Sequence, residues 1–154
     1  ANQVKKLLGD RVEIVPTANI PQGIAALLAF NPKETIAVNT RRMSERLDQV
    51  QAASITVAVR DSMVDERLVS AGRFVGIMDN KIITDAPDLE TALDGLLREM
   101  VSAASEVITL YYGQEVSQEK AQALVERITD NYPGIEVEIY DGGQPYYHLI
   151  ISIE

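Results

Sequence analysis

The sequence contains no cysteine, no tryptophan and only one histidine. Without cysteine there can be no disulfide, no thiol nucleophile and no thiolate metal site. One histidine cannot form a two-histidine metal site. The longest apolar stretch, residues 24–30, falls far short of the ~20 residues that a membrane-spanning helix needs. We therefore expect a cytoplasmic protein without a membrane span.

Common catalytic motifs are also missing. There is no GxxxxGK[ST] phosphate loop, no GxGxxG and no HExxH. A Ser-His-Asp triad would have to use His148, which lies in the alternating stretch from Tyr147 to Ile151. Because alternation predicts a strand, we interpret His148 as a surface or packing residue rather than a base.

The charge balance limits the class of partner. The net charge is −9 and the pI is about 4.6, so a phosphate backbone or an anionic membrane surface would repel the chain. Arg41, Arg42 and Arg46 lie on one predicted helix, and we interpret them as part of a solvent-exposed face. We expect neither nucleic acid nor a membrane as a partner.

Hydrophobic periodicity predicts an α/β fold made of two small lobes. The first lobe, residues 1–104, has the order β-α-α-β followed by a hairpin and a helix. Its expected elements are a buried strand at 12–15, a largely buried helix at 24–30, a helix at 35–50, a strand at 54–60, a polar loop at 61–70, a hairpin at 74–84 and a helix at 89–101. Residues 4–8 resemble the end of a helix capped by Gly9, so we expect this lobe to be truncated at its N-terminus.

The second lobe, residues 105–154, has the predicted order β-α-β-β. Strands are expected at 107–112, 135–140 and 147–153, with a helix at 117–131 whose N-cap is Ser117. A unit of about 50 residues is marginal by itself. We therefore expect it to pack against the first lobe.

Three connections are candidate recognition sites. In the first, Asn19 or Thr17 can cap a helix that has Pro21 in its first turn. Free N–H groups at such a helix start attract anions, although a purely structural turn explains the segment equally well.

The second connection follows the strand at 54–60. Asp61, Asp65 and Glu66 could hold Mg²⁺ through oxygen ligands at the end of a strand. A solvated acidic loop, with Arg60 and Arg67 as counter-charges, is the favoured interpretation.

The third connection is Asp141-Gly142-Gly143-Gln144-Pro145, whose glycines permit positive φ. We interpret it as a hairpin turn. Tyrosines surround it in the predicted strands, either as sheet filling or as an interface; they are Tyr111, Tyr112, Tyr140, Tyr146 and Tyr147.

Several longer strings are specific enough to suggest a family. They are VPTANIPQGIAALLAFNP (15–32), TVAVRDS (56–62), VGIMDNKI (75–82), ITLYYG (108–113) and VEIYDGGQPYYHLIISIE (137–154). In order and spacing, the chain resembles the C-terminal region of the dihydroxyacetone-kinase-like proteins that serve as the A subunit of bacterial fatty acid kinase. The family usually has Asp-Gly at Asp65-Glu66, Gly-Asp at Gly72-Arg73 and an aromatic residue at His148.

This resemblance implies an ATP-dependent kinase with an upstream nucleotide domain, which holds ATP and Mg²⁺. It also implies that a separate lipid-binding B subunit carries the fatty acid, which is converted to acyl phosphate. For this region it implies no catalytic, cofactor or metal residues, but docking of that subunit. Our candidate contacts are Asn19, Pro21, Gln22, Gly23, Arg60, Asp61, Gly142, Gly143, Gln144 and Tyr146.

Two other functions remain open on the residues alone. One is a Mg²⁺-dependent phosphatase or hydrolase that uses Asp61 and Asp65. The other is a structural domain that forms a homodimer by burying the tyrosine-bearing sheet.

Overall fold

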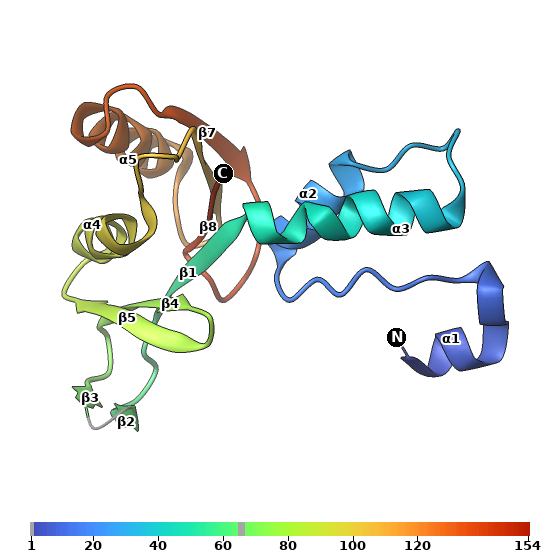
Figure 1. The fold of residues 1–154 in the computed structure, drawn as a ribbon. Coiled ribbons are helices and arrows are strands. Elements are labelled where there is room, and N and C mark those ends of the chain that lie inside the picture. The colour runs from blue at the N-terminus through green and yellow to red at the C-terminus, as the bar shows by residue number, and fades with distance from the viewer. Residues whose placement is uncertain (1, 65–66) are drawn as a thin grey trace. The chain divides into compact units, whose positions relative to one another are not determined.

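The computed structural model describes residues 2–64 and 67–154. The chain forms two compact units, Ala1–Val50 and Gln51–Glu154 (Figure 1). The division therefore falls at Val50 and not at the predicted boundary near Ala104. The reason is that strands from both predicted lobes join a single sheet.

The first unit is helical throughout its regular elements. It contains α1 (Asn2–Leu8), η1 (Gly9–Arg11), α2 (Ile20–Leu28), α3 (Ile36–Glu45) and η2 (Leu47–Gln49). Asn19 caps α2, because its Oδ1 accepts a hydrogen bond from the Gln22 amide at 2.9 Å. Pro21 lies in the first turn of that helix. Both capping predictions are confirmed.

Two other predictions for this unit are wrong, and a third gives a helix that is too long. Residues 12–15 are not part of a sheet in the described structure, because a strand needs a partner strand and none is supplied. The helix expected to be largely buried exposes much of its apolar surface: Leu27 is 68% exposed and Leu28 is 82% exposed. The helix at 35–50 ends at Glu45 and continues as a 3₁₀ turn.

The second unit is built on a six-stranded mixed sheet with the order β5-β4-β1-β8-β6-β7. Neighbouring strands are antiparallel except for β6 and β7, which are parallel. The strands are β1 (Gln51–Val57), β4 (Phe74–Met78), β5 (Lys81–Ala86), β6 (Val107–Tyr112), β7 (Glu136–Asp141) and β8 (Leu149–Ile153). The mixed α/β class and the predicted β-α-β-β order of the C-terminal part are both confirmed.

A tight hairpin joins β4 and β5, as predicted. Asp79 and Asn80 have φ values of 50° and 61°, as a type I′ turn requires at its two central residues. Aspartate and asparagine accept this conformation more readily than most residues, so the local sequence specifies the turn.

Residues 58–64 and 67–73, which we call the arm, correct the expectation of a loop at 61–70. β2 (Ser62–Val64) pairs with β3 (Arg67–Val69) in an antiparallel ribbon, and the arm extends away from the main sheet (Figure 1). The Ala58 amide donates to Arg73 O at 2.9 Å, and the Gly72 amide donates to Ala58 O at 2.8 Å. Backbone pairing thus continues past the ends of β1 and β4, which polar composition alone did not indicate.

Two helices, α4 (Leu89–Met100) and α5 (Gln118–Asn131), cover one face of the sheet (Figure 1). Asp88 caps α4, and Ser117 caps α5 as predicted. The core between helices and sheet includes Leu93, Leu110 and Ile151, all fully buried. No helix among the described residues is long and apolar enough to cross a membrane.

Candidate functional site

Three connections leave the sheet of the second unit at the same end. Because β6 and β7 are parallel, their C-terminal ends, Tyr112 and Asp141, lie side by side. Antiparallel pairing places the start of β8 beside the end of β6, and the start of β4 beside the end of β1. Open α/β sheets place ligand-binding groups at such carboxyl ends.

We call this region the loop end. It comprises the arm, the turn at 113–116 and the loop at 142–148. The loop at 142–148 is not the hairpin turn that the sequence suggested. β6 lies between β7 and β8, so this loop must cross the end of β6.

Gly113 holds the turn against the crossing loop. Its amide donates to His148 O at 2.9 Å, and the Gln114 amide donates to Gln144 O at 3.1 Å. A Cβ at position 113 would lie 2.2 Å from Tyr147 O. Only glycine permits so close an approach of two backbone segments.

The crossing loop is fixed by its own side chains as well. Gly143 has a φ of 60° and donates its amide to Asp141 Oδ1 at 3.0 Å. The Gln144 Nε2 donates to Tyr111 O at 2.8 Å. A Cβ at position 142 would lie 2.1 Å from Gln144 Oε1. Gly142, Gly143 and Gln144 therefore shape the loop.

Tyr146 is attached to this loop but directed into solvent. Its carbonyl oxygen accepts a hydrogen bond from Thr56 Oγ1 at 2.8 Å, while the residue as a whole is 80% exposed. Tyr147 is exposed as well. The loop end thus presents aromatic rings from an anchored backbone.

His148 packs beneath the loop. Its ring meets the Phe74 ring edge-on, with 5.2 Å between centroids and 74° between planes. Nδ1 is buried and has no hydrogen-bond partner among the described residues. Burial lowers the pKa of His148, and Glu115 opposes that shift more weakly. These contacts fit a packing role and do not resemble those of a catalytic base.

The arm adds exposed apolar groups to the loop end. Val59 is 92% exposed, and Met63 and Leu68, which pair across β2 and β3, are exposed as well. Asp61 has a structural contact, because its Oδ1 accepts a hydrogen bond from the Ala71 amide at 2.7 Å. Arg60 is exposed.

The predicted Mg²⁺ pair cannot be placed as a pair. Asp65 and Glu66 lie outside the described residues. Within residues 2–64 and 67–154, no group of three or more histidine, aspartate or glutamate side chains is arranged to hold a metal ion. The hypothesis that Asp61 and Asp65 bind Mg²⁺ stays a prediction.

Tyrosines also lie on the sheet face opposite the core. The Tyr111 and Tyr140 rings stack with 5.8 Å between centroids. The Tyr140 hydroxyl donates to Glu138 Oε2 at 3.3 Å. Burial raises the pKa of Tyr111, and the negative charge of Glu138 raises the pKa of Tyr140, so both hydroxyls stay protonated at neutral pH.

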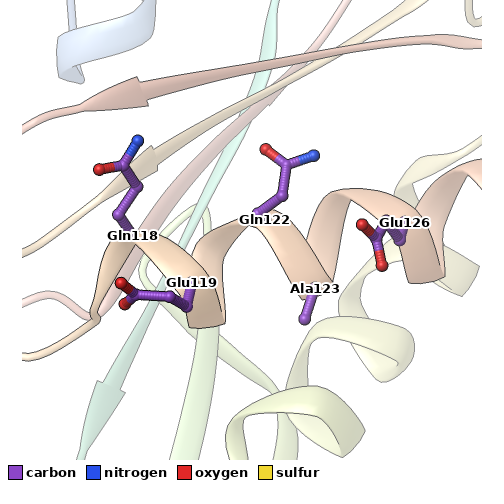
Figure 2. A pocket seen from close by; sticks show the side chains of 5 residues that line it. All are labelled: Gln118, Glu119, Gln122, Ala123 and Glu126. Atoms are coloured by element: carbon purple, nitrogen blue, oxygen red, sulfur yellow. The ribbon is translucent and has the colours of Figure 1, made fainter.

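Two hollows lie away from the loop end. One, of about 480 Å³, runs along α5 and is lined by Gln118, Glu119, Gln122, Ala123 and Glu126. All five side chains come from one helix (Figure 2), so they cannot enclose a ligand as a pocket does. The other, of about 410 Å³, lies in the first unit and includes Leu28, Arg42 and Arg46.

The structure brings together six of the ten predicted contact residues. These are Arg60, Asp61, Gly142, Gly143, Gln144 and Tyr146, all at the loop end. The other four, Asn19, Pro21, Gln22 and Gly23, belong to the first unit, where Gln22 also accepts a hydrogen bond from the Ala18 amide at 2.8 Å. Their contacts describe a helix cap, and a binding role for any of the ten stays a prediction.

Several residues of the loop end are not among the candidates predicted from the sequence. Gly113 could have been noticed as a glycine directly after an apolar strand. The pairing of Met63 with Leu68 had no clear signal, because each lies in an apolar pair, Met63-Val64 or Leu68-Val69, too short to stand out within a mostly polar segment. Thr56 could not have been found, since its partner is 90 residues away in the chain.

Comparison with known proteins agrees with this architecture and identifies the family. Residues 1–154 match the family of C-terminal regions of proteins like the A subunit of fatty acid kinase. The chain therefore belongs to this family, and the resemblance found in its sequence is confirmed.

The relatives are longer than this chain. Protein YloV of Bacillus subtilis is 37% identical over 154 residues, and protein SH1689 of Staphylococcus haemolyticus is 34% identical over the same length. Each alignment covers 100% of this chain but 28% of the relative. The chain thus spans under a third of the length of these relatives.

Solved structures show a similar fold at low sequence identity. A DegV family protein, Cg2579 of Corynebacterium glutamicum, has a TM-score of 0.62 and 15% identity, covering 99% of this chain and 67% of that one. A DegV family protein of Thermus thermophilus, described for its fatty acid binding, has a TM-score of 0.53 and 7% identity, covering 87% of this chain and 56% of that one. At these identities the likeness shows the fold alone.

Proposed function

We propose that this chain is the non-catalytic C-terminal region of an ATP-dependent fatty acid kinase, and that its loop end docks the subunit that carries the fatty acid. The docked fatty acid would then be converted to acyl phosphate by a nucleotide domain elsewhere in the protein. Family membership supports the connection with fatty acid kinase. The observation that carries the docking role is the set of exposed apolar and aromatic side chains on an anchored loop end.

The chemistry assigned to other parts of the kinase is a phosphoryl transfer. An oxygen of the fatty acid carboxylate forms a bond to the γ-phosphorus of ATP, and ADP leaves with the electrons of the broken bond. Mg²⁺ and cationic groups would neutralise the charge of the phosphates. The described residues here bring together no ligand set that fits Mg²⁺, so we assign no step of the transfer to them.

Docking suits the physical character of the loop end. Aromatic residues and methionine are enriched at protein interfaces, and a few anchored residues usually supply most of the binding free energy. Tyr146, Met63 and Leu68 are of these types or strongly apolar. Because hydrogen bonds from Thr56 and Gln144 hold the loop backbone in place, binding there would immobilise few additional groups.

The described fatty acid binding of the Thermus thermophilus protein lends further support. A fold shared with a lipid-binding protein is compatible with a role near a lipid carrier. The shared fold does not assign the lipid to this chain, and we place the fatty acid in the partner.

Isothermal titration calorimetry with the purified fatty-acid-binding subunit tests the proposal. We expect wild-type protein to bind the lipid-loaded subunit. Tyr146→Ala, and separately the pair Met63→Ser and Leu68→Ser, should each weaken binding about tenfold or more, as interface hot spots do. Gln122→Ala, on the exposed side of α5, is the control and should leave the affinity unchanged. Absence of wild-type binding, or equal affinity of all variants, would contradict the proposal.

The two other functions have distinct readouts. A homodimer would change the elution volume with protein concentration in the absence of the partner. A phosphatase would release phosphate from an ester in the presence of Mg²⁺, and Asp61→Asn would abolish that release. Either result without partner binding would favour the corresponding function over docking.

A further inference from the structure

The six-stranded sheet of the second unit ends on two edge strands, β5 and β7. An edge strand presents a row of unpaired backbone N–H and C=O groups, and another strand can pair with them unless the edge is protected. The two edges of this sheet differ in how far they are protected.

The β5 edge is protected in two ways. Its pairing with β4 shifts register between Gly76 and Ile77, and a bulge of this kind twists an edge away from a straight partner strand. Arg73 also binds this strand, because its Nη2 donates to Asp85 O at 3.0 Å and its Nε donates to Asp85 Oδ1. One carbonyl of β5 is therefore already taken.

The β7 edge is regular. Residues 136–141 pair one by one with residues 107–112 of β6, without a register shift. The Glu136 amide donates to Glu106 O at 2.9 Å, and the Gly142 amide donates to Tyr112 O at 3.0 Å. Because N–H groups alternate in direction along a strand, residues 137, 139 and 141 direct theirs away from β6. No described strand lies on that side, so the edge offers free donors and acceptors.

The outer face of β7 defines which charge a pairing strand would carry. Val137 and Ile139 pack against the core, so the alternate residues Glu136, Glu138 and Tyr140 lie on the opposite face. The Tyr140 ring is stacked on Tyr111, and the residue is 50% exposed. A neighbouring strand would place its side chains beside two carboxylates and an aromatic ring, and lysine and arginine suit both.

The helix-facing side of the same edge is apolar. Val137 and Ile139 face the core but are only partly buried there. A strand paired with β7 would cover them further with every second side chain. The segment that fits both faces therefore alternates basic and apolar residues.

The charge of the second unit favours such a partner as well. Residues 51–154 contain 18 acidic and 7 basic side chains, whereas residues 1–50 contain 5 acidic and 7 basic side chains. A surface with this excess of carboxylates attracts cationic segments and speeds their association.

We propose that the β7 edge binds an extended segment of a partner protein in which basic and apolar residues alternate. The segment adds a further strand to the sheet, so that backbone hydrogen bonds supply affinity, while Glu136, Glu138 and Tyr140 select lysine or arginine. This surface is separate from the loop end, and the inference does not rest on the docking proposed there.

Other occupants fit the edge less well. Two copies paired through β7 would bring Glu136, Glu138 and Asp141 of both copies together, and like charges on adjacent strands are destabilising. A lipid surface would leave the backbone groups unpaired. The first unit has no β-strand among its described residues that could supply the pairing.

Amide hydrogen exchange followed by NMR tests the inference on the 154-residue chain. The probe is a synthetic peptide in which lysine and valine alternate. Without the peptide, we expect the amides of residues 138 and 140 to exchange slowly and those of residues 137, 139 and 141 to exchange fast. Saturating peptide should slow the latter three by about tenfold or more, because they then donate to a paired strand.

Fluorescence anisotropy with the labelled peptide separates strand pairing from attraction by charge alone. The same peptide methylated on its backbone nitrogens keeps its lysines but cannot donate backbone hydrogen bonds. We expect it to bind about tenfold more weakly or worse.

Two variants with the same change of charge locate the binding surface. Glu136→Lys should weaken binding of the unmethylated peptide about fivefold or more, because it turns an attractive pair into a repulsive one. Glu126→Lys, on the exposed side of α5, should change the affinity less than about twofold. Equal losses in the two variants, equal affinity for the methylated peptide, or unchanged exchange at residues 137, 139 and 141 would overturn the inference. Slow exchange of these three amides without peptide would overturn it too, because the edge would already be covered.

Discussion

At the scale of single residues, Gly113 is the position where a side chain would be least tolerated. A Cβ there would meet Tyr147 O at 2.2 Å and Gln144 O at 2.6 Å. Both atoms belong to the backbone, which cannot move aside as the end of a flexible side chain can. We expect Gly113→Ala to lower the free energy of unfolding by about 1–3 kcal/mol, measured by urea denaturation.

Gly143→Asn is the matched control for that change. Gly143 has a φ of 60°, which asparagine tolerates, and a Cβ there would meet nothing within 4 Å. The free energy of unfolding of the Gly143→Asn variant should therefore change little. An unaltered stability of Gly113→Ala would show that the turn and the crossing loop are not held as closely as described.

His148 should make stability depend on pH. Burial lowers the pKa of His148 in the folded state below the 6.5 of a free histidine, so the fold favours the neutral ring. The resulting stabilisation is complete above pH 6.5 and is lost as the pH falls from there through the lowered pKa. Between about pH 8 and pH 5, we expect the unfolding free energy of wild type to fall more than that of His148→Phe.

The carboxylates with lowered pKa values should contribute little to the change in unfolding free energy within this pH range. Hydrogen bonds from Thr91 and Lys120 lower the pKa values of Asp88 and Glu90, and backbone hydrogen bonding lowers that of Glu119. The ordinary pKa values of these side chains are 3.8 for aspartate and 4.5 for glutamate, so their contributions are lost at lower pH. If His148→Phe and wild type show the same pH dependence, the histidine is not buried in its neutral form.

At the scale of elements, the burial of the apolar side chains of α4 should contribute more to stability than the ion pairs between α4 and α5. Arg127 makes a bidentate contact from α5 to Asp94 of α4, at 2.9 and 2.5 Å, and Lys120 pairs with Glu90. These pairs are partly exposed, so solvent screening should leave each of them only a small contribution to stability. Leu93 is fully buried, and Leu93→Ala should cost about 2–5 kcal/mol.

Urea denaturation of Leu93→Ala and Arg127→Gln compares the two directly. A double-mutant cycle with Asp94→Asn isolates the coupling energy of the ion pair. A larger loss for Arg127→Gln than for Leu93→Ala would contradict this ranking.

Element prediction succeeded where the controlling interactions are local. The α4 repeat of Leu89, Leu93, Leu96 and Met100, the Asp79-Asn80 turn and the Ser117 cap depend on residues within a few positions of one another. It failed for the arm and for the 142–148 loop. Those depend on which strands are neighbours, and residues distant in the chain decide that.

The candidate site shows the same division. Gly142, Gly143 and Gln144 were identifiable because turn residues carry a local signal. Their meeting with Gly113 and Thr56 follows from β6 lying between β7 and β8, which no local pattern contained.

At the scale of the whole molecule, the two units should unfold separately. The first unit has few buried side chains, whereas the second has a continuous core. All six tyrosines lie between residues 111 and 147, in the second unit, and there is no tryptophan. We expect far-ultraviolet circular dichroism to report an early loss of helix in urea, before tyrosine fluorescence changes.

Coincident transitions by the two probes would contradict this expectation, since they would indicate one cooperative unit. Leu93→Ala offers a further check, because it should shift the tyrosine transition and leave the early helical loss unchanged.

The domain boundary was mispredicted at this scale for a related reason. The sequence suggested a boundary after residue 104, but β1, β4 and β5 before it share a sheet with β6, β7 and β8 after it. Loops separate domains only when few contacts cross them, and contacts across the sheet cannot be read from composition.

The place of β8 has a consequence for how the protein is made. β8 is completely buried and lies between β1 and β6, which the ribosome synthesises much earlier. Until residues 149–153 leave the exit tunnel, β8 cannot join the group β5-β4-β1 to the group β6-β7. The edges of both groups that β8 will cover therefore stay exposed. A nascent chain in that interval would be a substrate for chaperones that bind emerging apolar segments, and a stop codon just before residue 149 would leave the two groups of strands unjoined.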